Sequence, residues 1–175
     1  GCVNGSDLWL DGEASSSEAT AALSAMTAHH GGGVFSERAF SLLQVALGGA
    51  NVGSGGCNEG LVRSGAGLHL VGVSDEAEQS SGSWQDHVAA LQALHPDAAG
   101  VVFHAIGGDG EGCGSGPFTG FLDAVELTGG ASLSLCSGDG EGDMAVLAAA
   151  MAELVGEPAT EGPYLLSATP VVSSI

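Results

Sequence analysis

Basic side chains are nearly absent from the sequence. The 175 residues contain 2 Lys+Arg against 21 Asp+Glu, which gives a formal net charge of -19. The two basic residues are Arg38 and Arg63, and there is no lysine. Proteins that bind nucleic acids neutralise phosphates with clustered Lys and Arg, and anionic membrane surfaces attract the same side chains. The composition therefore excludes a nucleic-acid partner and disfavours an anionic membrane surface.

Long apolar runs are missing as well. No apolar run approaches the ~20 residues that cross a bilayer, so we expect no membrane insertion. Hydrophobic residues still make up 44% of the chain, whereas disordered chains combine high charge with low hydrophobicity. The sequence thus predicts one folded domain. Because like charges repel in a compact fold, we expect cations or salt to offset the acidity.

The four cysteines are spaced too widely for a Cys-x-x-Cys pair, which disfavours zinc-ribbon and thioredoxin chemistry. An even number fits two disulfides, for which three connectivities exist. We favour the sequential pairs Cys2–Cys57 and Cys113–Cys136, and the alternative is four reduced thiols. Disulfides indicate an oxidising location, which is secreted, cell-surface or periplasmic.

Helical and strand patterns alternate along the chain. Apolar periodicity predicts helices over residues 13–30, 35–47, 83–94, 118–127 and 143–155, and short apolar runs predict strands over residues 67–73, 101–106 and 131–135. Glycine-rich stretches separate them, as loops do; residues 48–60 are one of these. This alternation predicts an α/β fold with a mainly parallel sheet, whose sites form at the carboxyl ends of the strands.

Several segments, in their order, resemble von Willebrand factor A (vWA) domains of bacterial surface and secreted proteins. The stretch Leu70–Glu76, with the acidic loop and helix after it, resembles the fourth strand and next helix of that family. Similar matches occur at residues 36–43, 112–116, 128–130 and 134–136. The resemblance covers roughly residues 30–155. It implies a three-layer, Rossmann-like sheet flanked by helices and a role in protein–protein interaction or adhesion.

The resemblance also shows what this chain lacks. The family's metal-ion-dependent adhesion site begins with Asp-x-Ser-x-Ser, which is absent here. The family's threonine before the next helix is replaced by residues 31–35, which contain no hydroxyl group. Asp75 matches the later aspartate of the site. A single carboxylate holds Mg²⁺ poorly, so the site is degenerate or is completed by residues outside the chain.

The resemblance further implies that the family's first three strands precede Gly1. The strand at residues 68–73 then has an unpaired apolar edge, which comprises Leu68, Leu70, Val71 and Val73. Because such edges aggregate unless they are covered, we expect an upstream piece of a longer precursor, another subunit, or Leu8–Leu10 to pair there. Within one unit, residues 1–30 form an N-terminal loop and helix, residues 31–155 the vWA-like core, and residues 156–175 an extended tail or linker to a following module.

The motif Gly-Asp-Gly-Glu-Gly occurs twice, at residues 108–112 and 138–142. Alternating carboxylates among glycines are typical of calcium loops, although the spacing of an EF-hand is missing. A Cys113–Cys136 bridge would bring the two loops together, and a cation would relieve their repulsion. Including the adhesion-site aspartate, the candidate ligands for Ca²⁺ or Mg²⁺ are Asp75, Asp109, Glu111, Asp139, Glu141 and Asp143. The plainer alternative, which the incomplete spacing favours, is a pair of solvated turns.

His69 and His104 alternate with apolar residues on two adjacent predicted strands. We expect them at the rim of the core, where a histidine pair can titrate near neutrality. The chain has neither a His-Glu-x-x-His motif nor a Gly-x-Ser-x-Gly elbow, so we do not expect an enzyme. The sequence favours an extracellular protein-interaction or adhesion module. The alternatives are a structural subunit of an extracellular assembly and, less favoured, a secreted hydrolase that uses Asp75 and its neighbours.

Overall fold

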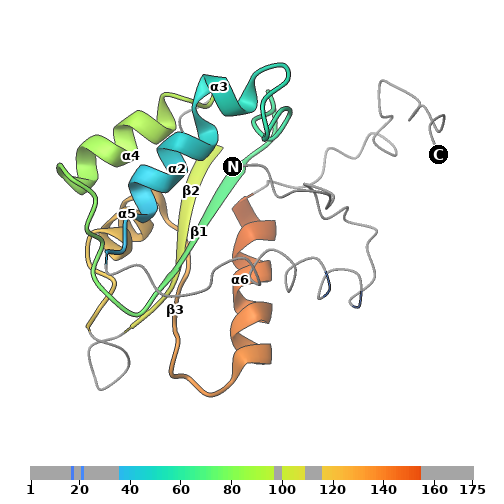
Figure 1. Cartoon of the computed structure of the whole chain (residues 1–175). Coiled ribbons are helices and arrows are strands. Elements are labelled where there is room, and N and C mark those ends of the chain that lie inside the picture. Colours follow the sequence, from blue (N-terminus) through green and yellow to red (C-terminus); the bar gives the residue numbers. More distant parts are fainter. Residues whose placement is uncertain (1–16, 18–20, 22–35, 97–99, 109–115, 155–175) are drawn as a thin grey trace.

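A computed structural model describes residues 17, 21, 36–96, 100–108 and 116–154 (Figure 1). The predicted tail, 156–175, and almost all of the predicted N-terminal segment, 1–30, lie outside these residues. Ser17 and Ala21 are helical, as expected for a helix over 13–30. In the described part of the chain, no helix is both long and apolar enough to cross a membrane.

The sheet has three strands, β1 (Leu68–Ser74), β2 (Val101–Gly107) and β3 (Ser132–Ser134), in the spatial order β1-β2-β3. Both pairings are parallel. β2 pairs with β1 along the full length of both strands, from Leu68 opposite Val101 to Ser74 opposite Gly107. β3 pairs only with the last three residues of β2. The expected α/β fold with a parallel sheet is confirmed at this level.

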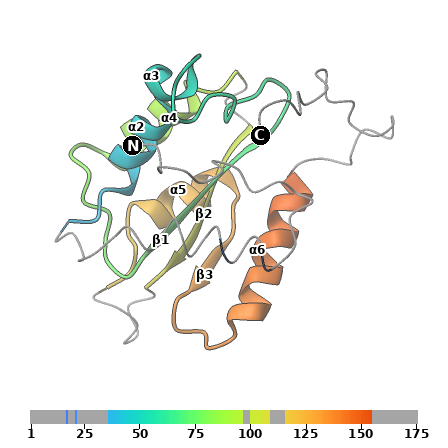
Figure 2. The same ribbon diagram turned by 45° about the vertical axis from the view of Figure 1, so that its right-hand side comes forward.

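The described helices are α2 (Ala39–Leu47), α3 (Gly49–Val52), α4 (Trp84–Gln92), α5 (Phe121–Thr128) and α6 (Gly140–Leu154). Figures 1 and 2 show α2, α4 and α5 on one side of the sheet and α6 on the other. The chain steps in one direction across the sheet, so two right-handed crossovers place α4 and α5 on the same face. The carboxyl ends of the strands point to the lower edge in Figure 1.

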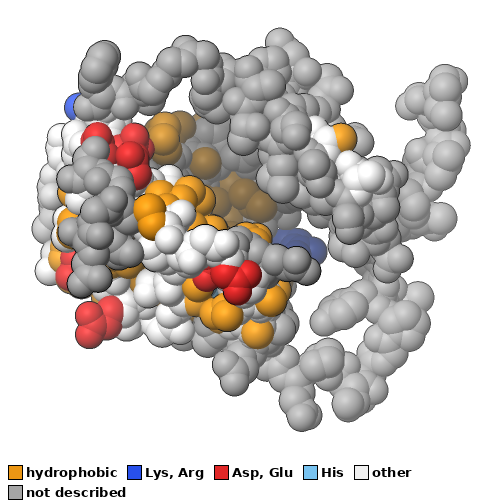
Figure 3. All heavy atoms as spheres, turned by 90° about the horizontal axis from the view of Figure 1, so that it is seen from below, with side chains coloured by type: hydrophobic (Ala, Val, Ile, Leu, Met, Phe, Trp, Pro, Cys, Tyr) orange, Lys and Arg blue, Asp and Glu red, His pale blue; other side chains and the backbone are white. Residues whose placement is uncertain are grey.

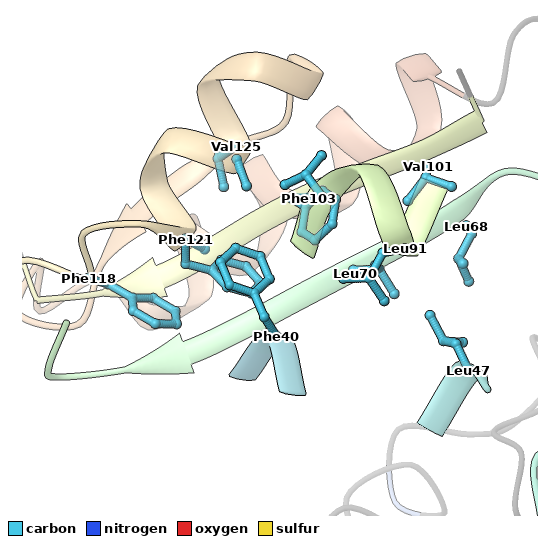
Figure 4. Close-up of a cluster of buried hydrophobic side chains, with 13 residues drawn as sticks. Phe40, Leu47, Leu68, Leu70, Leu91, Val101, Phe103, Phe118, Phe121 and Val125 are labelled. Atoms are coloured by element: carbon cyan, nitrogen blue, oxygen red, sulfur yellow. The ribbon is translucent and has the colours of Figure 1, made fainter. Parts of the chain in front are cut away.

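The core lies between the sheet and the layer of α2, α4 and α5. Alternate residues of β1 and β2 face this layer, where five aromatic or aliphatic side chains pack closely (Figure 4). They are Leu70, Phe103, Phe40, Phe118 and Phe121. The rings of Phe118 and Phe121 stack with centroids 4.8 Å apart. Such close packing of rings on a sheet requires small residues in the strand beneath them.

Gly72 provides that space in β1. A Cβ atom at Gly72 would lie 2.7 Å from the Phe121 ring, closer than a carbon atom tolerates. A Cβ atom at Gly107 in β2 would lie 2.8 Å from the Cβ of Phe118. These two glycines therefore sit inside strands because the phenylalanines occupy the room of their side chains.

Some predicted boundaries were wrong for local reasons. α2 begins at Ala39 because the backbone of Arg38 is not helical. α5 begins only after Gly120, because a φ of 83 at this residue is incompatible with a right-handed helix. α6 begins at Gly140, earlier than residue 143, because Asp139 caps it. The predicted loop 48–60 contains the short helix α3. The predicted cap of α4 is confirmed, since the Ser83 side chain accepts a hydrogen bond from the Asp86 N–H at 3.1 Å.

Candidate functional site at the carboxyl edge of the sheet

The end of β1 forms a tight polar turn. The Ser74 hydroxyl accepts a hydrogen bond from the Glu76 N–H at 3.1 Å, and the Ser74 carbonyl accepts one from Gly108 at 3.1 Å. The second bond joins the loop after β1 to the loop after β2. Asp75, between Ser74 and Glu76, is exposed. The predicted metal ligand therefore lies at the expected edge of the sheet.

Glu78 has a structural role that the sequence did not reveal. Its carboxylate accepts hydrogen bonds from the Phe40 N–H at 3.3 Å and from the Ser80 N–H at 2.7 Å. The Ser80 hydroxyl accepts another from the Ser41 N–H at 3.0 Å. The first turn of α2 has no acceptor of its own, because the N-cap residue Arg38 forms no side-chain cap. A carboxylate at this position also complements the positive end of the helix dipole.

A cavity of about 260 Å³ opens beside this cap. Its walls come from the starts of α2, α4 and α5 and from the loop after β1. They comprise Phe40, Glu78, Ser80, Gly82, Ser83, Trp84, Gln85, His87, Thr119 and Gly120. Helix N-termini and hydroxyl groups give this cavity a polar lining.

His87 is the least expected residue of this cavity. Its ring is buried and stacks on Phe40 with centroids 5.3 Å apart. Its Nε2 lies 3.1 Å from the Ser81 carbonyl oxygen, which can only accept, so Nε2 carries the proton. Nδ1 is buried and has no hydrogen-bond partner in the part of the chain described. His87 is not among the site residues that the sequence predicts, although its helical spacing from Trp84 and Leu91 places it on the core face of α4.

The acidic motif at residues 138–142 spans the start of α6 and caps this helix. The Asp139 carboxylate accepts a hydrogen bond from the Gly142 N–H at 3.0 Å, which makes Asp139 the N-cap of α6. The Asp143 carboxylate accepts one from the Ser137 hydroxyl. Carboxylates in the first turn are stabilised by the helix dipole without a metal. These contacts fit the plainer interpretation of the motif.

The proposed metal set is only partly within the described residues. Asp109 and Glu111 lie outside them, and the side chain of Glu141 is not described. Among the residues that are described, no group of three or more His, Cys, Asp or Glu side chains could hold a metal ion. Figure 3, viewed from the carboxyl edge, shows the acidic side chains in separate groups among apolar ones. A site that joins all six ligands stays a prediction.

Cys57 and Cys136 are both disulfide-bonded. Cys2 and Cys113 lie outside the described residues, so the two sequential pairs stay a prediction. Of the four residues predicted to form the unpaired edge, Leu68 and Leu70 turn their side chains into the core. Val71 and Val73 are exposed by 38% and 61% on the opposite face. β1 pairs with β2 along one side, and no described segment pairs with its other side.

The structure brings His69 and His104 together on the face of the sheet opposite α4 and α5. Nδ1 of His69 lies 2.9 Å from Nε2 of His104, and the rings stack with centroids 5.2 Å apart. The His104 side chain is fully buried. Burial lowers the pKa of both imidazoles, and the neighbouring His69 lowers the pKa of His104 further. The expected pair therefore exists, and it favours the neutral form.

Comparisons with known proteins add no assignment to this geometry. No protein-family model, curated protein or solved structure matches the chain.

Proposed function

We propose that the chain is an extracellular protein-interaction or adhesion module of the vWA type, with a degenerate or incomplete metal-ion-dependent adhesion site. The parallel order β1-β2-β3, with helices on both faces of the sheet, supports this proposal because the resemblance implies such an arrangement. The disulfide bonds of Cys57 and Cys136 support a secreted, cell-surface or periplasmic location. The absence of Asp-x-Ser-x-Ser from the sequence supports a degenerate site.

The side of β1 with which no described segment pairs is the observation that carries the proposal. β1 has seven residues and, within the described ranges, a strand partner on one side only. Val71 and Val73 expose apolar side chains on the same strand. An unpaired apolar strand offers backbone N–H and C=O groups to an added strand, and alternate side chains give specificity. The partner is therefore an extended protein segment that pairs with β1.

Charge defines the partner further. The whole chain carries a net charge of -19, and β1 runs directly into Asp75 and Glu76. A second copy of this chain would be repelled at low salt, whereas a segment with basic flanks would be attracted. We therefore expect alternating apolar residues in the partner strand, with Lys or Arg on either side of it.

A labelled peptide of alternating Val and Thr, flanked by lysines, tests the proposal by fluorescence anisotropy. We expect binding that weakens with salt and that protects the β1 amides from hydrogen exchange. Val73→Thr keeps a β-branched side chain but removes apolar contact, so we expect affinity to fall about fivefold, which corresponds to ~1 kcal/mol. Leu127→Thr is the matched control, because Leu127 is also 61% exposed but lies on α5.

Three outcomes would contradict the proposal. The same peptide with proline at alternate positions cannot form the strand ladder, and equal binding of that peptide would refute strand addition. No binding of either peptide would refute the choice of β1. Loss of binding in EDTA would show that a metal site is complete after all, which contradicts the degenerate site.

A further inference from the structure

The two histidines of the sheet form a chain of hydrogen bonds with a fixed direction. The Ala131 N–H donates to Nδ1 of His104 at 3.0 Å. A backbone N–H can only donate, so Nδ1 of His104 is unprotonated and its proton is on Nε2. That proton points to Nδ1 of His69, 2.9 Å away. Nδ1 of His69 is therefore an acceptor, and His69 carries its own proton on Nε2.

Neither imidazole can take up a second proton without losing a hydrogen bond. Protonation of His104 at Nδ1 places two N–H groups, its own and that of Ala131, against each other. Protonation of His69 at Nδ1 places a second N–H group against the Nε2–H of His104 and breaks the hydrogen bond between the two rings. His104 is 0% exposed, so water cannot replace the lost partner there.

Among the side chains that the structure describes, no other charged group acts on the two rings to compensate for an added proton. His69 and His104 are the only titratable residues of β1, β2 and β3. On α5, the Asp123 carboxylate accepts from the Gly120 N–H at 2.8 Å, and Glu126 is exposed; this helix covers the other face of the sheet. On α6, Asp143 accepts from Ser137. The remaining acidic residues of α6, Glu141 and Glu153, have side chains that are not described.

Ala131, which donates a hydrogen bond to His104, directly precedes β3 and helps to attach it to β2. The Ala131 carbonyl accepts a hydrogen bond from the Ala105 N–H at 3.0 Å, so β2 binds both backbone groups of Ala131. Gly130, before it, approaches β2 so closely that a Cβ atom would lie 1.7 Å from the Phe103 oxygen. β3 itself pairs through three residues only. This junction therefore carries much of the attachment of β3.

The described side chains of α6 add little to that attachment. Met144 and Val146 are exposed, and Leu147 is the buried side chain among those described on this helix. Figures 1 and 2 show α6 at the margin of the fold, next to β3. Loss of the junction at Ala131 would therefore loosen β3 and α6 together, while β1 and β2 stay paired along their full length.

We propose that His69 and His104 form a proton-sensitive latch, which holds β3 and α6 on the sheet at neutral pH and releases them in acid. The lowered pKa values of both groups agree with this role. The folded state resists protonation until the pH falls below the ordinary value of 6.5. Below it, the open form, in which both rings are hydrated, gains protons and becomes populated.

Hydrogen exchange of the full chain, with its disulfides intact, tests the latch. Exchange is measured at about pH 7.5 and about pH 5 and is corrected for the intrinsic pH dependence. We expect residues 132–134 and 142–151 to lose protection at the lower pH, whereas 68–74 and 101–104 keep it. His104→Asn places an amide oxygen near the position of Nδ1, where it accepts from Ala131 without titrating, so we expect this variant to keep its protection in acid.

His95→Gln is the matched control. His95 is buried, and its Nε2 lies 2.9 Å from the Ala66 carbonyl oxygen. Glutamine keeps an N–H that can donate to this carbonyl and leaves His69 and His104 unchanged, so this variant should open in acid like the unmodified chain. Protection of β3 that is unchanged in acid, or lost equally in His104→Asn, would overturn the latch.

If His104→Asn does not fold, NMR titration of the unmodified chain tests the latch instead. Ring protons of both histidines that titrate below 6.5, together with shifts of the β3 amides, support the latch. Titration of either ring at or above 6.5 overturns it.

Discussion

The carboxylate of Glu78 accepts a hydrogen bond from the backbone N–H of Phe40, 38 residues earlier in the sequence. One acidic side chain in the loop after β1 thereby caps α2, whose own sequence provides no acceptor at this end. The same Phe40 ring packs on Phe121 and His87. The cap thus positions the residue around which α2, α4 and α5 converge.

Glu78→Ala should destabilise the domain. Loss of an N-cap costs ~1 kcal/mol and up to about 2 kcal/mol, which denaturant unfolding measures as a lower midpoint at an unchanged slope. Glu78→Gln keeps an acceptor and should lose less. Glu126→Ala, which removes an exposed carboxylate from α5, controls for the change in net charge. Equal stability of the Glu78→Ala and Glu126→Ala variants would contradict the cap.

Gly72→Ala should disturb the aromatic core. The new Cβ would lie 2.7 Å from the Phe121 ring and 2.9 Å from the Phe118 ring. Overpacking of this kind costs on the order of 1–3 kcal/mol, which lowers the melting temperature. Gly49→Ala is the control, because a Cβ there meets nothing within 4 Å and Gly49 lies in α3. A Gly72→Ala variant as stable as Gly49→Ala would show that the phenylalanines move aside easily.

The free energy of unfolding should fall as the pH drops below 6.5. Burial lowers the pKa of His69 and His104 in the folded state, so the unfolded chain binds more protons in the window between the lowered values and 6.5. Stability is therefore full above 6.5 and is lost towards the lower pKa values, by at most about 1.4 kcal/mol per pH unit for each proton taken up. Denaturant unfolding between about pH 7.5 and about pH 5.5 measures the slope, which should flatten in a His69→Asn/His104→Asn variant. A slope shared by both chains would assign it to the carboxylates.

Calcium should stabilise the chain no more than an equal ionic strength of sodium chloride does. Asp139 and Asp143 already accept hydrogen bonds from Gly142 and Ser137, so screening of a net charge of -19 accounts for any rise in melting temperature. Melting curves at matched ionic strength test this expectation. A saturable extra rise with calcium, abolished by Asp139→Asn, would instead establish the metal site at the acidic loops.

The sequence by itself determined the elements and their class. Apolar runs at residues 67–73 and 101–106, separated by a helical pattern with Ser83 at its start, predicted two parallel strands and a crossover helix, since local periodicity and capping depend on neighbouring residues only. The same reasoning missed α3, whose 4 residues are too few for a helical period, and misplaced the start of α5, because Gly120 has a positive φ that composition does not show.

Only the tertiary structure decided which polar groups meet. Glu78 lies far from Phe40 in the sequence, and the register of β1 against β2 brings His69 within reach of His104. On sequence grounds Asp139 could bind calcium or lie in a solvated turn, and its contact with Gly142 shows instead that it caps α6. The sequence determines the chemistry of each side chain. Its partner, its burial and hence its protonation depend on distances that exist only after folding.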